Sequence, residues 1–201
     1  LDDRGDLSII GNSQPRLQFG VNLGASYKSF DFSMLWKGVG KRDYYFNERA
    51  VFYWGVMQMW WDSNIDANGK HLDYFRDEPG TKYHGLHEGD ANINTDAFFP
   101  RPYLNGADDR KNRAHANTRY LVNAAYVRLQ NIQIGYTLPS NLISRLHLQD
   151  VRVYFSGENL LTIDNLPKLI DPAALVGFSG MAGAATYGAD RVYSFGISLT
   201  Y

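Results

Sequence analysis

The residues of this sequence whose spacing suits metal chemistry lie near residue 65. In the stretch "DSNIDANGKHLD", oxygen-bearing side chains occupy alternate positions at Asp62, Asn64 and Asp66. Calcium takes carboxylate and amide oxygens in this manner. The match to an EF-hand loop is imperfect, because the glycine falls late and the last acidic residue is Asp73 instead of glutamate. The alternative is an Asx-rich turn without metal, and no other cofactor is predicted.

A second kind of chemistry is offered by aromatic rings, which stack on apolar faces of sugars and on peptide side chains. The segment "RDYYFNERAVFYWGVMQMWWD" is rich in them, and another tyrosine follows at position 74. Contact with a substrate or with a closing partner protein is predicted for Tyr45, Trp54, Trp60, Trp61 and Tyr74. The alternative, which is the stronger for any single ring, is that the rings pack their own segment together.

Other reactive groups are sparse. His84 and His87 lie three residues apart beside acidic residues, but no third zinc ligand is evident. The chain has no cysteine, no Ser/His/Asp arrangement and no phosphate-binding loop. No catalytic residue and no enzyme are therefore predicted. The net charge of −1 gives no electrostatic reason to expect nucleic acid as a partner.

The elements that must hold these side chains are strands, because apolar and polar residues alternate along five segments. Side chains of a strand point to opposite faces in turn. Upstream of Gln130, Val127 and Leu129 are out of phase with the residues that follow, which predicts a β-bulge near Gln130. The five predicted strands lie near 16–27, 30–40, 119–138, 150–163 and 191–201.

The connections between these strands alternate in length. Two residues join the first pair and about a dozen join the third and fourth strands, whereas 41–118 and 164–190 are much longer. Transmembrane β-barrels have short turns on one side and long loops on the other. No run of about 18 apolar residues is present, so no transmembrane helix is predicted.

Two further features distinguish a membrane sheet from a soluble one. The polar sides of the strands are rich in Gly, Ser, Asn and Gln, with few of the Lys and Glu of a solvated surface. Tyr, Phe and Trp stand at the ends of the apolar sides, as interfacial girdles require. We therefore expect an all-β fold with about five antiparallel strands of a transmembrane barrel. A soluble β-sandwich remains the alternative.

Three segments carry a family resemblance: "IGNSQPRLQFGVNLGASYKSFDFSMLWKGVG" (10–40), "YVRLQNIQIGYTLPSNLISRLHLQDVRVYFSGENLLTIDN" (126–165) and "RVYSFGISLTY" (191–201). The most telling pieces of the second are "YVRLQNIQIGYTLP" (126–139) and "VRVYFSGENLLT" (151–162). In this order the three segments resemble the C-terminal part of SusC/RagA-like TonB-dependent transporters. The resemblance implies the last strands of a large, plugged barrel with extracellular loops at 41–118 and 164–190. Because open sheet edges are not tolerated in lipid, the rest of the barrel is expected outside these residues, as are the plug domain and the TonB box.

The same resemblance implies a function. It implies TonB-dependent import of a nutrient, an oligosaccharide or an oligopeptide, across the outer membrane of a Bacteroidetes-type bacterium. The implied partners are a SusD-like surface lipoprotein, TonB, the remainder of the barrel and outer-membrane lipid. A passive porin or adhesin barrel is one alternative, and a soluble β-sandwich carbohydrate-binding module is another.

The last eleven residues fit the barrel-assembly signal of outer-membrane proteins. Their large side chains alternate with small ones, and the stretch ends on an aromatic residue. The residues expected to carry this signal are Ser194, Gly196, Leu199 and Tyr201.

Overall fold

The structure, a computed structural model, describes residues 8–46, 54, 72–102, 115–143, 148–166, 170–175 and 188–201. The chain divides into two compact units, which we describe separately. The sheet unit comprises residues 14–42, 123–165 and 189–201, and the loop unit comprises residues 1–13, 43–122 and 166–188. No described helix is long and apolar enough to cross a membrane.

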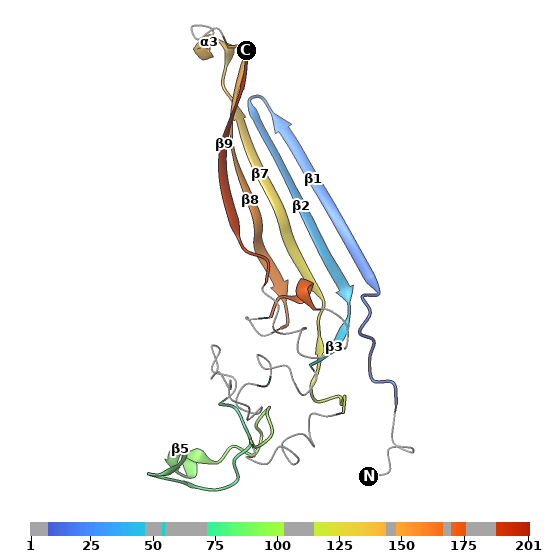
Figure 1. The fold of residues 1–201 in the computed structure, drawn as a ribbon, viewed down its shortest axis with the longest axis vertical. Helices are drawn as coiled ribbons and strands as arrows, with labels where there is room; N and C mark the ends of the chain where they lie inside the picture. Colours follow the sequence, from blue (N-terminus) through green and yellow to red (C-terminus); the bar gives the residue numbers. More distant parts are fainter. Residues whose placement is uncertain are drawn as a thin grey trace. The chain divides into compact units, whose positions relative to one another are not determined.

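The sheet unit is built on one five-stranded antiparallel sheet (Figure 1). The strands are adjacent in the order β1-β2-β7-β8-β9, so each one pairs with the next long strand along the chain. The all-β antiparallel fold class predicted from the sequence is confirmed. The strands are β1 (Leu17–Tyr27), β2 (Phe30–Lys41), β7 (Tyr126–Thr137), β8 (Asp150–Asp164) and β9 (Val192–Thr200).

The connections of the sheet unit follow from local residues. Lys28 and Ser29 form the tight turn between β1 and β2, and Lys28 has a positive φ of 54°. A short helix, α3 (Ser140–Ile143), follows Pro139 between β7 and β8. The third strand was expected to begin at residue 119, but the structure has a separate short strand, β6 (Leu121–Asn123), before β7.

The predicted bulge at Gln130 is confirmed. The pairing of β2 with β7 passes from Leu35 opposite Asn131 to Trp36 opposite Leu129, which leaves Gln130 as the extra residue. The extra residue reverses the phase of β7. As a result, Leu129 lies on the same face as Ile132 in spite of their opposite phase in the sequence.

The two faces of the sheet differ in chemistry, because residues opposite each other on neighbouring strands share a face. Cross-strand rows on the apolar face include Ala25, Phe32, Ile134, Phe155 and Phe195, and next to it Tyr27, Phe30, Tyr136, Val153 and Ile197. Rows on the polar face include Gly24, Ser33, Gln133, Ser156 and Ser194, and next to it Ser26, Asp31, Gly135, Tyr154 and Gly196.

A second irregularity in the sheet lies in β8, and the sequence pattern did not indicate it. The register against β7 passes from Glu158 opposite Asn131 to Leu161 opposite Leu129. Asn159 lies between them with a positive φ of 53°, a conformation for which Asn is favoured among non-glycine residues. Its side-chain amide donates to the Asp190 carbonyl at 3.2 Å.

The loop unit contains short strands around an aromatic core. β3 (Asp43–Tyr45) pairs with β6, and β4 (Gly80–Thr81) pairs with β5 (His84–Gly89). Two 3-10 helices, η2 (Asp90–Asn92) and η4 (Pro172–Ala174), also belong to this unit. Its buried hydrophobic residues include Tyr44, Tyr45, Phe46, Trp54, Ala97, Phe99 and Tyr120.

Candidate functional site

The apolar face of the sheet is exposed over several strands. Ile134 on the central strand β7 is 44% exposed, and Ile197 on β9 is 68% exposed. Most soluble monomers expose only small apolar patches, and a β-sandwich buries such a face against a second sheet. The described strands of the sheet unit form one main sheet, the five-stranded one. The face is therefore chemically suited to an apolar medium.

Aromatic residues concentrate at the end of this face near the β1–β2 turn. Tyr27 pairs with Phe30, which pairs with Tyr136. The rings of Phe30 and Tyr136 lie with centroids 4.7 Å apart. Rings with a polar group are favoured where an apolar medium meets water, so this row is placed as an interfacial girdle would be.

The polar face carries an ion pair that crosses the middle strand. Arg152 on β8 donates to Asp31 on β2 from Nε at 2.9 Å and from Nη2 at 2.5 Å. Gly135 on β7 lies between them, and a Cβ atom there would overlap atoms of both side chains. The guanidinium also lies over the Tyr154 ring, 5.1 Å from its centroid. A glycine on β7 is thus what allows β2 and β8 to be bridged.

The residues expected to carry the assembly signal have these positions. Ser194 lies opposite Ser156, and Leu199 lies opposite Val151 on the apolar face. Gly196 lies opposite Tyr154, whose ring a Cβ atom at position 196 would overlap. Tyr201 follows β9 and is 93% exposed. A role of these residues in assembly stays a prediction.

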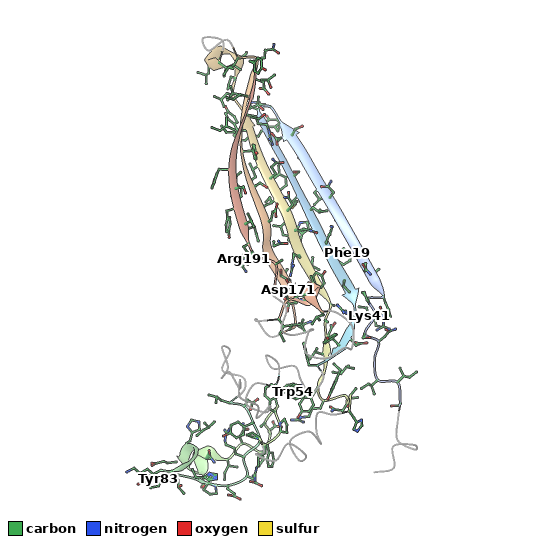
Figure 2. The ribbon with its side chains drawn as sticks, in the orientation of Figure 1. Phe19, Lys41, Trp54, Tyr83, Asp171 and Arg191 are labelled. Carbon is green, nitrogen blue, oxygen red and sulfur yellow. The ribbon has the colours of Figure 1, made fainter. Side chains whose placement is uncertain are left out.

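Trp54, labelled in Figure 2, packs against other aromatic rings of the loop unit. Its side chain is fully buried, and its indole N–H donates to the Phe46 carbonyl at 3.3 Å. The Tyr120 ring lies 5.0 Å away and the Phe99 ring 6.2 Å away, centroid to centroid. For Trp54 the structure thus shows the packing alternative, because a fully buried ring presents no surface to a ligand in this conformation.

Burial has an electrostatic consequence in this core. Tyr120 is 4% exposed, and its burial raises the pKa of the hydroxyl above the ordinary value of 10.0, while the charge of Arg119 opposes that rise. The physical cause is that a tyrosinate would lose its hydration. Tyr120 is therefore held in its neutral form.

The other predicted contact residues lie in different surroundings. Tyr45 is 7% exposed, and the Asn117 side chain donates to its hydroxyl at 3.5 Å, so it too belongs to the packed interior. Tyr74 is half-buried on the wall of a cavity. The remaining candidates lie outside the described residues: Trp60 and Trp61 among the aromatic residues, and Asp62, Asn64 and Asp66 among the calcium candidates.

The cavity beside Tyr74 has a volume of about 350 Å³. We call it the Arg76 cavity, and its wall includes Tyr74, Arg76, Asp77, Glu78, His84 and Arg101. No sequence motif brought these residues together. Two residues of the cavity wall have a signal in the sequence: Tyr74 as an aromatic side chain in a long loop, and His84 as a possible zinc ligand.

Asn92 is part of the wall of the Arg76 cavity and is 4% exposed. Its side-chain oxygen accepts from the Leu86 amide at 2.9 Å, and its side-chain nitrogen donates to the Glu78 carbonyl at 2.9 Å. Its own carbonyl accepts from Arg76 Nε at 2.7 Å. A single buried asparagine therefore bonds to Arg76, Glu78 and Leu86, and such satisfied buried groups hold a local structure rigidly.

Both guanidinium groups of the cavity are anchored. Arg76 Nη1 donates to the carbonyls of Leu72 and Tyr74, and its guanidinium lies 4.7 Å from the Tyr74 ring centroid. Arg101 forms an ion pair with Asp77. Two fixed positive groups and two carboxylates thus line one cavity.

The histidines considered as zinc ligands lie on β5. His84 and His87 are both exposed. Across the part of the chain that the structure describes, no group of three or more His, Cys, Asp or Glu residues could hold a metal ion.

Comparison with known proteins gives relatives of one kind. No protein-family model matches the chain. TonB-dependent receptor P3 of Formosa agariphila is 29% identical over 186 residues, which are 87% of this chain and 15% of that receptor. TonB-dependent receptor P26 of the same bacterium is 23% identical over 98% of this chain and 18% of its own length. The chain therefore spans less than a fifth of the curated relatives it matches.

Solved structures agree in fold. The RagAB peptide transporter matches 95% of this chain with a TM-score of 0.63 and 23% identity, over 18% of the length of that protein. The RagAB peptide importer in the closed-closed state matches with a TM-score of 0.61 and the same identity. These proteins are named as receptors, transporters or importers and not as enzymes.

Proposed function

We propose, from the premise that the chain is a segment of a SusC/RagA-like TonB-dependent transporter, that it forms part of the wall of an outer-membrane barrel. The whole transporter would import a nutrient across the outer membrane. The observation that carries this proposal is the exposed apolar face, backed by a polar face with small side chains. A lipid-facing side and a lumen-facing side are what a transmembrane barrel wall requires.

The direction of the strands constrains the rest of the wall. Each neighbouring pair in the order β1-β2-β7-β8-β9 is antiparallel, so β1 and β9 run in the same direction. Pairing β9 with β1 would therefore make a parallel ladder. An all-antiparallel closure needs an odd number of additional strands, which agrees with the much greater length of the relatives.

The proposal for the substrate and the partners rests on the family resemblance and on the likeness in fold to RagAB. An oligopeptide or an oligosaccharide would be captured on the outer side, together with a SusD-like surface lipoprotein, and TonB would supply energy through the part of the protein outside these residues. The fold likeness to RagAB, which is named a peptide importer, favours a peptide.

Uptake by cells tests this proposal. Cells that express the full-length protein would be given labelled oligopeptides and labelled oligosaccharides, with a deletion strain as the control. We expect uptake of one class, lost when TonB is deleted or the proton gradient is collapsed. Uptake that survives both treatments would indicate a passive pore, and recovery of the protein in the aqueous phase without detergent would rule out the barrel.

A further inference from the structure

We propose that the Arg76 cavity binds a small zwitterion, a molecule with one carboxylate and one ammonium group. Arg76 and Arg101 supply donors for the carboxylate, and Asp77 and Glu78 supply acceptors for the ammonium group. The inference rests on the proposed function in one respect, since it takes the loop unit to be open to the external medium.

Some N–H groups of Arg76 and Arg101 have no hydrogen-bond partner among the described residues. Arginine has five N–H donors. Arg76 spends Nε and Nη1 on backbone carbonyls, and within the described residues its Nη2 has no hydrogen-bond partner. Arg101 pairs through Nη2, which leaves its Nε and Nη1 without a partner among the described residues. Because both groups are already anchored, little side-chain freedom is lost when a planar carboxylate binds them.

The acceptors are likewise available. Asp77 accepts from Arg101 through Oδ1. Glu78 is held by its backbone carbonyl, which accepts from Asn92, and its carboxylate makes no hydrogen bond or ion pair to any described residue. The Glu78 carboxylate can therefore accept a hydrogen bond from a cationic group bound in the cavity.

The balance of charge decides the class of ligand. Two guanidinium groups and two carboxylates line one cavity, where Arg101 and Asp77 already pair with each other, so the formal charges of these four side chains cancel. A purely anionic ligand would meet Asp77 and Glu78, and a purely cationic ligand would meet Arg76 and Arg101. Juxtaposed like charges are costly at a binding site. A ligand with both signs avoids this cost.

The size of the cavity and its aromatic wall fit the same class. About 350 Å³ lies at the lower end of the range of small-molecule sites, roughly 300–1,000 Å³. Tyr74 presents a ring beside the Arg76 guanidinium, which offers an apolar surface for the carbon chain between the two charged groups.

Calorimetric titration of the full-length protein in detergent tests the proposal. The probes are glycine, 4-aminobutyrate and 6-aminohexanoate, which differ in the number of methylene groups between the two charges. We expect at least one to bind, and blocking either end, as the methyl ester or the N-acetyl derivative, to weaken binding about ten-fold or more. Absence of binding at millimolar concentration, or equal binding of the blocked probes, would overturn the proposal.

Variants locate the binding to the cavity. Arg101→Gln and Glu78→Gln should each weaken binding about ten-fold or more, because each removes one charged hydrogen bond. Lys82→Gln is the matched control, since it removes a charge from the β4–β5 turn outside the cavity wall. If Arg101→Gln disturbs folding, Glu78→Gln decides the question, and unchanged binding in that variant would contradict the proposal.

The cavity and the import function can fail separately. Intact TonB-dependent uptake with no binding of the probes would overturn the cavity site alone. Probe binding that Glu78→Gln abolishes, in a protein that imports nothing, would support the site and overturn the proposed function.

Discussion

At the scale of single residues, the smallest side chains decide which larger ones can meet. The ion pair of Asp31 and Arg152 joins residues 121 positions apart and passes over Gly135. The ring of Tyr154 occupies the space that a side chain at Gly196 would fill. Glycine is usually a poor strand residue. In this sheet it is required where a neighbouring strand places a large polar side chain across it.

Gly135→Ala should destabilise the sheet unit by about 1–3 kcal/mol, because the added methyl overlaps both members of the ion pair. The measurement is the heat-induced unfolding midpoint of the full-length protein in detergent. Gly24→Ala is the matched control on the same face, since a Cβ atom there meets only the Phe32 carbonyl at an ordinary 3.6 Å. Equal midpoints for the two variants would refute the close approach at Gly135.

The burial of Tyr120 should make the stability of the loop unit depend on pH. Its pKa is raised in the folded state, so its contribution to stability is complete below the unfolded value of about 10 and is lost as the pH rises through the folded value. Hydrogen exchange of residues 115–122, corrected for intrinsic rates between pH 8 and 11, measures it. Protection should fall above pH 10 in the natural protein and fall less in Tyr120→Phe. The same pH profile in both proteins would contradict this assignment.

At the scale of elements, irregular positions keep the two faces of the sheet continuous. Along the sequence, the apolar residues of β7 change phase between Leu129 and Ile132. The bulge at Gln130 reverses the side-chain direction at the same point. Without it, Leu129 and Val127 would lie on the polar face, because a shift of one residue exchanges the faces of a strand.

Deletion of Gln130 should therefore block assembly. It would turn half of β7 over and place polar side chains, including the Arg128 guanidinium, on the apolar face. We expect the full-length protein to be lost from the outer-membrane fraction, as measured by immunoblot after fractionation. Gln130→Ala keeps the length of the strand and should accumulate normally. Normal amounts of the deletion variant would mean that the bulge does not set the phase.

At the scale of the whole molecule, the proposed function requires the sheet unit to be part of a larger barrel wall. Its edge strands β1 and β9 run in the same direction, and its apolar face is exposed. Open edges are not tolerated in lipid. The matched relatives are more than five times longer than the segment that aligns with this chain. Under the proposed function, strands outside this segment would pair with both edges.

The proposed contact of the apolar face with lipid predicts that the cost of introducing a charge depends on the face of the sheet. Ile134→Arg should destabilise the full-length protein by about 2–4 kcal/mol near the middle of the membrane, because the charge enters hydrocarbon. Gln133→Arg on the polar face should cost much less. Unfolding in urea from lipid vesicles compares the two. Similar costs for both variants would argue that the apolar face does not contact lipid.

Much of the fold could be predicted from the sequence, because side-chain alternation is local. The strands, their two faces and the bulge at Gln130 all follow from a period of two along the chain and its interruption. The family resemblance depends on such strand segments as well. The irregularity at Asn159 was not predicted, because the apolar residues on either side of it keep the same phase.

The candidate site depended on long-range contacts that have no local signal. The sequence by itself determined that aromatic residues gather in the loop, and only the tertiary structure decided that Trp54 is buried while Tyr74 lines a cavity. It also decided that Arg76 and Arg101 share that cavity and that Arg152 reaches Asp31. Alternation sets which face a side chain takes, but burial and partners depend on which distant segments pack against it.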